Sequence, residues 1–130
     1  MIVPGVELAG VHLLMSERGV RHALGAPRAP RTRADGSRRL DFAHGTKVYI
    51  SATGDGTVFR ITTTDRRQRT RGAGAASQGV GVGSSRAAVL RAVPTARCDA
   101  RACVTGRKRI TSFALHDGRV VRVALHFAGV

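Results

Sequence analysis

Residues 109–127 read RITSFALHDGRVVRVALHF, and this stretch decides the fold class of the chain. Asp117-Gly118 supplies the positive φ angles that a tight hairpin turn requires, so the stretch predicts two antiparallel strands. The second strand alternates apolar and polar side chains, which predicts one buried face and one solvent face. The apolar set is Val121, Val123 and Leu125, and the polar set is Arg122 and His126.

Three further turn signals precede this hairpin. They are Ala34-Asp35-Gly36, His44-Gly45 and Gly54-Asp55-Gly56, and they separate the runs RRLDFA, TKVYISA and TVFRITTT. Short runs with β-branched and aromatic residues between such turns are typical of strands. The stretch from Asp55 to Ile61 also aligns with the stretch from Asp117 to Val123. We therefore expect residues 38–64 to form an antiparallel meander.

Each group of predicted strands follows a glycine-rich stretch with helical periodicity. Residues 10–27 read GVHLLMSERGVRHALGAP and align without gaps with GVGVGSSRAAVLRAVPTA at residues 79–96. Ser16 is a predicted N-cap of the first helix, and Ser84 or Ser85 caps the second, because a hydroxyl there accepts from the first free backbone N–H groups. Gly25 and Pro27 predict the end of the first helix.

The alignment of the two halves predicts a duplicated α+β fold. We expect two tandem units, each a short helix followed by an antiparallel β-meander, at residues 1–64 and 79–130. Residues 65–78, DRRQRTRGAGAASQ, have no apolar periodicity and are interpreted as a basic, Gly/Ala-rich linker. With 42% apolar residues but no Trp and one Tyr, the core must consist mainly of aliphatic side chains.

This pattern resembles the SmpA/OmlA (BamE-like) family, whose tandem-repeat form is similar to the β-lactamase inhibitor protein fold. The resemblance covers residues 10–127 and implies an envelope-associated protein that binds other proteins. No catalytic residue belongs to the pattern, and no lipid-anchor cysteine stands near the start. The matching residues are Gly10, Val11, Ser16, Val20, Leu24, Gly25 and Pro27 in the first unit, and Gly79, Val80, Val82, Gly83, Ser85, Val89, Val93, Asp117, Gly118, Val120 and Val123 in the second.

The two cysteines, Cys98 and Cys103, enclose the four residues DARA. This spacing is wider than the CxxC of metal and redox sites. Two cysteines that flank a short loop can face each other across a hairpin and form a disulfide. A disulfide would imply an oxidising compartment, and two free thiols in a cytosolic protein are the alternative.

The chain carries 22 Lys and Arg against 8 Asp and Glu, a net charge of +14. Such an excess favours polyanions. Only two of the 22 are lysines, however, and an arginine bias beside abundant Ala, Gly and Val is also the pattern of a GC-rich genome. The densest run is RRQRTR, in which no aromatic residue is available to stack on bases. Its candidate contacts to nucleic acid or an acidic polymer are Arg66, Arg67, Arg69 and Arg71.

No catalytic constellation is visible. GxSxG, HExxH and P-loop motifs are absent, and residues 79–85 lack the spacing of a dinucleotide-binding loop. We therefore expect a protein that is not an enzyme and has no metal or cofactor. The preferred function is a bacterial exported or envelope-associated module that binds another protein through a sheet face. The alternative is a basic module that binds nucleic acid or another acidic polymer.

The expected disulfide and the family resemblance predict an extracytoplasmic location, secreted or in the cell envelope. Residues 1–10, MIVPGVELAG, have neither the basic start nor the long apolar core of a signal peptide, so none is expected within this chain. No apolar run is long enough to span a membrane as a helix.

Overall fold

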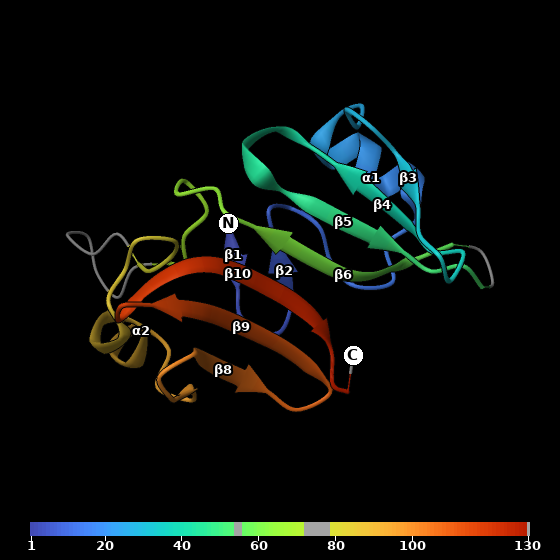
Figure 1. The fold of residues 1–130 in the computed structure, drawn as a ribbon. Helices are drawn as coiled ribbons and strands as arrows, with labels where there is room; N and C mark the ends of the chain where they lie inside the picture. Colours follow the sequence, from blue (N-terminus) through green and yellow to red (C-terminus); the bar gives the residue numbers. More distant parts are fainter. Residues whose placement is uncertain (54–55, 72–78, 130) are drawn as a thin grey trace.

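A computed structural model describes residues 1–53, 56–71 and 79–129 (Figure 1). The predicted hairpin around Asp117-Gly118 is confirmed, because both residues have positive φ angles, 51° and 74°. The elements in chain order are β1 (Ile2–Val3), β2 (Glu7–Leu8), α1 (Glu17–Leu24), β3 (Arg31–Thr32), β4 (Arg38–Asp41), the 3-10 turn η1 (Ala43–Gly45), β5 (Lys47–Ile50), β6 (Val58–Thr63), α2 (Arg86–Ala92), β7 (Arg97–Cys98), β8 (Ala102–Gly106), β9 (Arg109–His116) and β10 (Arg119–Phe127).

Eight of the strands form one antiparallel sheet, in the order β3-β4-β5-β6-β10-β9-β8-β7. Its centre is the pairing of β6 with β10, in which Ile61 lies opposite Leu125 and Thr63 lies opposite Val123. Strands β9 and β10 are the longest, and they pair from Arg119–His116 to Phe127–Arg109. The strands from β3 to β10 therefore form one continuous layer, and β1 and β2 form a separate two-stranded sheet (Figure 1).

The predicted α+β fold of two tandem helix-plus-meander units is wrong. The chain is mostly β, with one eight-stranded sheet and only two α-helices, of eight and seven residues, among the described residues. The physical reason is the edge of β6, whose free N–H and C=O groups pair with β10 and so join the strands into one sheet. The predicted boundaries at 64, 65–78 and 79 stay a prediction, since residues 72–78 lie outside the described part of the chain.

Both helices begin where the sequence predicts. The hydroxyl of Ser16 accepts from the backbone N–H of Gly19, and that of Ser85 accepts from Ala88 at the same distance of 3.1 Å. Gly25, with φ 84°, ends α1, and its N–H donates to the carbonyl of Arg21. Each helix buries one valine completely, Val20 in α1 and Val89 in α2. The helices lie at opposite ends of the molecule (Figure 1).

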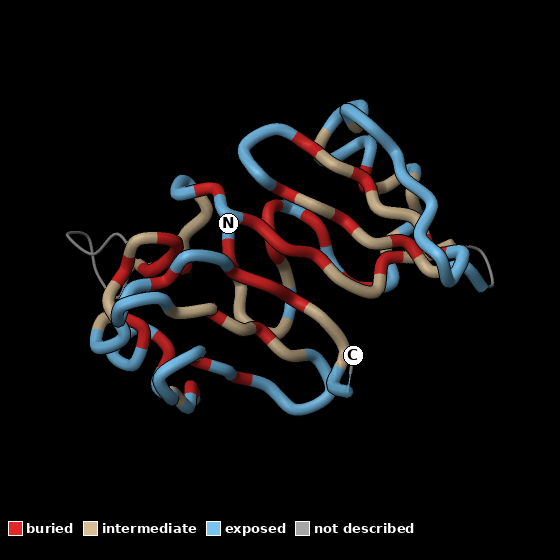
Figure 2. The backbone as a smooth tube through the Cα atoms, viewed as in Figure 1, coloured by how far each residue is buried: buried red, intermediate tan, exposed pale blue. Residues whose placement is uncertain are grey.

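The N-terminal segment fills the space between the helices on the same face of the sheet. Ile2, Leu8, Val11 and Leu13 are almost fully buried and belong to the same core as Phe113 and the other inward residues of the sheet. Figure 2 shows buried stretches of backbone along the strands of the sheet. The backbone N–H of Gly5 donates to the hydroxyl of Thr111 on β9. The chain therefore has two layers, the sheet and a cover of β1, β2, α1 and α2.

Strand β10 departs from the predicted alternation at one residue. Its register shifts between Val120 and Arg122, where a bulge interrupts the pairing with β9. Val120 is buried, and Val121 is 45% exposed. Val123 and Leu125 are buried as predicted. Placing Val121 on the buried face was therefore wrong, because a bulge shifts every side chain that precedes it by one face.

The glycines at 79 and 81 allow two backbone segments to touch. The N–H of Thr70 donates to the carbonyl of Val80, and Arg69 forms an antiparallel bridge with Gly81. A Cβ atom at Gly81 would lie 2.2 Å from the carbonyl oxygen of Gln68. This close approach explains the glycine-rich stretch without a dinucleotide, and it ties residues 68–70 to the segment that leads into α2.

Replacing Gly81 with alanine is expected to lower the free energy of unfolding by about 1–3 kcal/mol, the usual cost of overpacking. Urea unfolding followed by circular dichroism measures the change. Gly19→Ala is the matched control, since Gly19 lies inside α1 and its added methyl meets the flexible side chain of Met15. That control is expected to leave stability within about 1 kcal/mol or raise it. Equal destabilisation by both substitutions would contradict the close-approach argument.

Candidate binding surface

The strand register separates the core face of the sheet from an opposite, open face, whose strand residues are half-buried or exposed except for Thr62 and Ala124 at the centre, which are buried. The helices and β1–β2 cover only the core face, because their buried residues share one cluster with the inward residues of the sheet. The β3–β6 half of the open face is basic and aromatic, whereas the β8–β10 half is small and apolar. Neighbouring open-face residues form one row of Arg31, Arg39, Tyr49, Arg60, His126 and Ile110, and a second row of Asp41, Lys47, Thr62, Ala124, Ser112, Val104 and Arg97.

Two aromatic rings lie together on the basic half. Tyr49 of β5 and Phe59 of β6 are half-buried, with ring centroids 6.1 Å apart and ring planes tilted by 56°. The guanidinium carbons of Arg33 and Arg60 lie 5.3 Å and 6.0 Å from the centroid of the Tyr49 ring. With Asp35, these residues line an open hollow of about 330 Å³. We call these five residues the aromatic–arginine cluster.

The β3–β4 turn holds Asp35 at the rim of this hollow. Its Oδ1 atom accepts from the backbone N–H of Ser37 at 2.9 Å and from the Ser37 hydroxyl at 2.6 Å. The hydroxyl bond first, and then the backbone bond, lower the pKa of Asp35 below its usual value. Asp35 is therefore a fixed negative charge beside two arginines.

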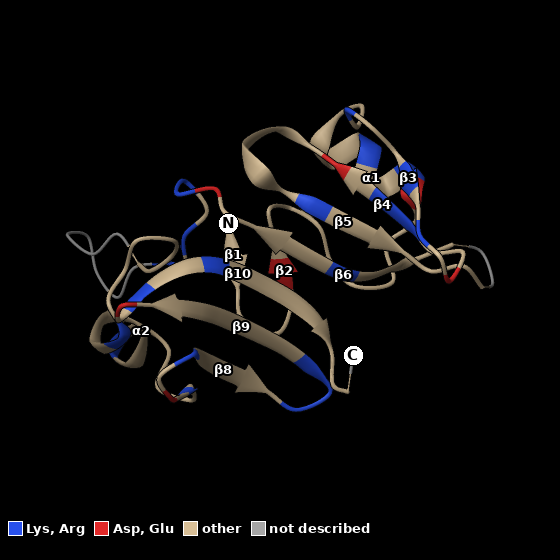
Figure 3. Ribbon diagram, viewed as in Figure 1, with Lys and Arg blue, Asp and Glu red and all other residues tan. Residues whose placement is uncertain are grey.

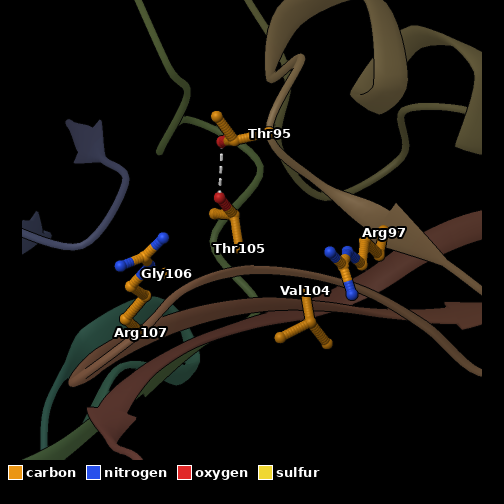
Figure 4. Close-up of a pocket in the computed structure, with 6 residues that line it drawn as sticks. All are labelled: Thr95, Arg97, Val104, Thr105, Gly106 and Arg107. Atoms are coloured by element: carbon orange, nitrogen blue, oxygen red, sulfur yellow. Dashed lines mark hydrogen bonds between the residues drawn. The ribbon is translucent and has the colours of Figure 1, made fainter.

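A second hollow, of about 680 Å³, lies at the β8 edge of the sheet (Figure 4). The hydroxyls of Thr95 and Thr105 hydrogen-bond at 2.6 Å, and the exposed side chains of Arg97 and Arg107 flank the hollow with Val104 between them. Strand β7 pairs with only two residues of β8, Cys103 and Val104. The hollow thus lies between the apolar half of the open face and the positively charged edge that Arg97 and Arg107 form.

The predicted disulfide is present. Cys98 and Cys103 are opposite each other on β7 and β8, with their Cα atoms 4.0 Å apart and their sulfurs bonded. The turn between them is held by Asp99, whose Oδ1 accepts from the backbone N–H groups of Arg101 and Ala102. These two bonds lower the pKa of Asp99, the Arg101 bond most. The bridge therefore closes a preorganised hairpin and anchors the short edge strand.

The four arginines of the run at residues 66–71 have different surroundings in the structure. Arg67 pairs with Asp65 through its Nε atom and a second nitrogen, each at 3.2 Å. Arg69 donates to the carbonyl of Gly79 and to the hydroxyl of Ser84. Arg66 lies over Gly83, and Arg71 lines a hollow beside the N-terminus. The run is thus divided: Arg69 is half-buried and bonded to the segment that leads into α2, whereas Arg66, Arg67 and Arg71 are exposed, Arg67 with an ion pair to Asp65.

Basic residues are spread over most elements of the chain (Figure 3). Within the described ranges, no group of three or more His, Cys, Asp or Glu side chains is arranged to hold a metal ion. In the same ranges, no helix is long and apolar enough to cross a membrane.

The comparisons with known proteins show the fold and nothing finer. No family model and no curated protein matches the chain. Its structure is similar to that of an extracellular protein containing a SCP domain from Bacillus anthracis str. Ames, with a TM-score of 0.65 and 7% sequence identity. The match covers 89% of this chain and 44% of that one, so the chain spans less than half of that protein. The resemblance to the SmpA/OmlA family stays a prediction.

The aromatic–arginine cluster was missed by sequence reasoning. Its members come from the β3–β4 turn, β5 and β6, and no contiguous motif marks them. The available signal was the alternation of KVYI, which turns Tyr49 away from buried Val48 and Ile50. A bulge between Tyr49 and Ile50 then sets Tyr49 opposite Arg60 and leaves Phe59 beside it. Alternation alone does not reveal that shift.

The disulfide is expected to stabilise the fold by less than the ~3 kcal/mol of a 15-residue loop, because the closed ring is short. A variant with Cys98→Ser and Cys103→Ser should unfold at lower urea concentration than the oxidised protein and match the wild type in reductant. Alkylation and mass spectrometry check the bridge itself. Two reactive thiols in the folded, air-oxidised protein would contradict it.

The Asp65–Arg67 pair predicts a specific pH dependence. Hydrogen bonding from the Arg67 side chain is the main cause that lowers the pKa of Asp65 from 3.8. A lowered folded-state pKa stabilises the fold above the unfolded value, and the effect is lost as pH falls through the folded value. Asp65→Asn should therefore be less stable than wild type at pH 6, and the gap should close below about pH 3.8. Urea midpoints across this range measure the gap.

Asp117→Asn is the control for this experiment, since the Asp117 side chain is 91% exposed and its ion pair with exposed His116, at 3.4 Å, is of the surface kind that adds little stability. Its stability difference from wild type should be small throughout. A gap for Asp65→Asn that is constant from pH 6 to pH 2 would contradict the role of the ion pair.

Proposed function

We propose that this chain is a non-catalytic module that binds another protein through the apolar half of its open sheet face. The observation that carries this proposal is a patch of small and aliphatic side chains that neither helix covers. We call it the apolar patch, and it consists of Ala102, Val104, Ile110, Ser112 and Ala114. Val104 is 38% exposed at its edge. Uncovered apolar surface of this kind is typical of protein interaction sites.

Arginines border the apolar patch, and their positive charge indicates that a partner would place acidic side chains against them. Arg97 and Arg107 flank the hollow at the β8 edge, and Arg122 lies opposite Ala114 on β10. All three are exposed. A partner surface with an apolar centre and a rim of Asp or Glu residues would match the apolar patch in hydrophobicity and its bordering arginines in charge.

Most of the carboxylates already have structural roles, which supports a function without acid–base catalysis. Asp35 and Asp99 hold turns, and Asp65 pairs with Arg67. Asp41 pairs with Arg39, and Glu17 pairs with arginines of α1 and β4. A general acid or base must be free to exchange a proton with a substrate. The proposal therefore assigns these groups to stability.

A location outside the cytoplasm, in a bacterial envelope or secreted, belongs to the same proposal. Its support is the Cys98–Cys103 disulfide, because such bridges persist in oxidising compartments. The structural neighbour is described as an extracellular protein. Both observations are compatible with an exported binding module.

Substitution of Val104 with arginine is expected to weaken partner binding at least tenfold, because it places a charge in the apolar patch. Immobilised oxidised protein first captures partners from extracellular and envelope fractions, and interferometry then measures the affinity of each purified partner. Leu90→Arg is the matched control, since Leu90 is 42% exposed on α2 and lies away from the open face. It should bind as the wild type does.

Equal binding by the Val104→Arg and wild-type proteins would exclude the apolar patch as the interface. Salt dependence separates the alternative function. Binding through apolar contacts should persist at high salt, whereas polyanion binding falls steeply as salt rises.

A further inference from the structure

The aromatic–arginine cluster uses the aromatic side chains that the core does not need. Of the one Tyr and four Phe in the chain, Phe42 and Phe113 are buried among aliphatic residues. Tyr49 and Phe59 instead lie half-buried on the open face, at an angle that forms a corner. Packing between strands does not require two rings there. A ligand with an apolar ring face would gain contact with both.

The two arginines of the cluster are positioned in advance. Arg33 comes from the turn between β3 and β4, and Arg60 comes from β6, yet both guanidinium groups lie against the ring of Tyr49. Attraction to the ring restricts their rotamers at little cost. Two guanidinium groups restricted in this way offer several N–H donors to one planar carboxylate, which they can bind through paired hydrogen bonds.

Asp35 offers a hydrogen-bond acceptor to a hydroxyl group of the ligand. Among the described residues, both hydrogen bonds to its carboxylate are accepted by Oδ1, so the lone pairs of Oδ2 are left for a further donor. A phosphodiester group has no donor for this oxygen. A sugar hydroxyl can donate to it. The cluster thus combines cations, a hydrogen-bond acceptor and two ring faces.

The hollow is small and open, about 330 Å³, which is the lower end of ligand sites. This size suits one monosaccharide unit and leaves both neighbouring units of a longer chain in solvent.

We infer that the aromatic–arginine cluster binds a carboxylated sugar, a uronate unit of an acidic polysaccharide. In this mode Arg33 and Arg60 bind the carboxylate, Tyr49 and Phe59 contact the C–H face of the pyranose ring, and Asp35 accepts from a ring hydroxyl. The inference goes beyond protein binding by the apolar patch and does not depend on it, since the cluster occupies the β3–β6 half of the open face.

Calorimetric titration with a trimer of galacturonic acid tests this inference on the full oxidised chain. The fully methyl-esterified trimer has the same rings without the charge, and it should bind at least tenfold more weakly. Arg33→Gln and Arg60→Gln should each weaken binding of the acid trimer at least fivefold, and Tyr49→Leu should do so at least tenfold. Circular dichroism confirms that each variant is folded.

Arg91→Gln is the matched control, since it removes one exposed positive charge on α2, away from the open face. It should change the affinity less than twofold. Equal binding of the acid and the ester would overturn the inference, as would an Arg91→Gln loss equal to that of Arg33→Gln and Arg60→Gln. An oligothymidylate that binds more tightly than the acid trimer, and depends on the same arginines and Tyr49, would overturn the ligand class in favour of nucleic acid.

Discussion

The pairing of β6 with β10 is the constraint on which the rest of the structure depends. Without it, each strand would end its part of the sheet as an unpaired edge, with a row of exposed N–H and C=O groups. The pairing places Ile61 beside Leu125 and lets the segments on either side share one core. It joins residues some sixty positions apart, so the chain must close a long loop before the sheet is complete. The open face exists because this joined sheet has only one covered side.

Features that depend on a few neighbouring residues could be predicted from the sequence. The caps at Ser16 and Ser85, the turn at Asp117-Gly118 and the Cys98–Cys103 bridge each involve groups that lie close along the chain. The single sheet could not be predicted in this way, because nothing local indicates which edge β6 will join. The bulge at Val121 could not be predicted from the sequence for a related reason. It depends on how the β9–β10 hairpin fits its neighbours, and an alternating pattern reads the same with or without it.

Charge illustrates the same limit for the candidate site. RRQRTR is the most basic run in the sequence, but Arg67 and Arg69 are held by Asp65, Gly79 and Ser84. Arg33 and Arg60 attract no notice in the sequence, because they are isolated and separated by two strands. The fold nevertheless brings these two arginines together, because it places both guanidinium groups against the ring of Tyr49. The density of arginines along the sequence therefore does not indicate which of them the fold brings together.

Many arginines of this chain have a task that requires no ligand. Both edges of the sheet are two-residue strands that carry an exposed arginine, Arg31 in β3 and Arg97 in β7. Short, charged edges oppose strand-to-strand association, so these cations protect an eight-stranded sheet from aggregation. An exposed arginine such as Arg97 can attract an acidic rim on a partner, whereas binding of one planar carboxylate needs guanidinium groups that the fold restrains. This distinction separates the aromatic–arginine cluster from the general positive charge, because Tyr49 restrains two guanidinium groups where a ring corner and a fixed carboxylate meet them.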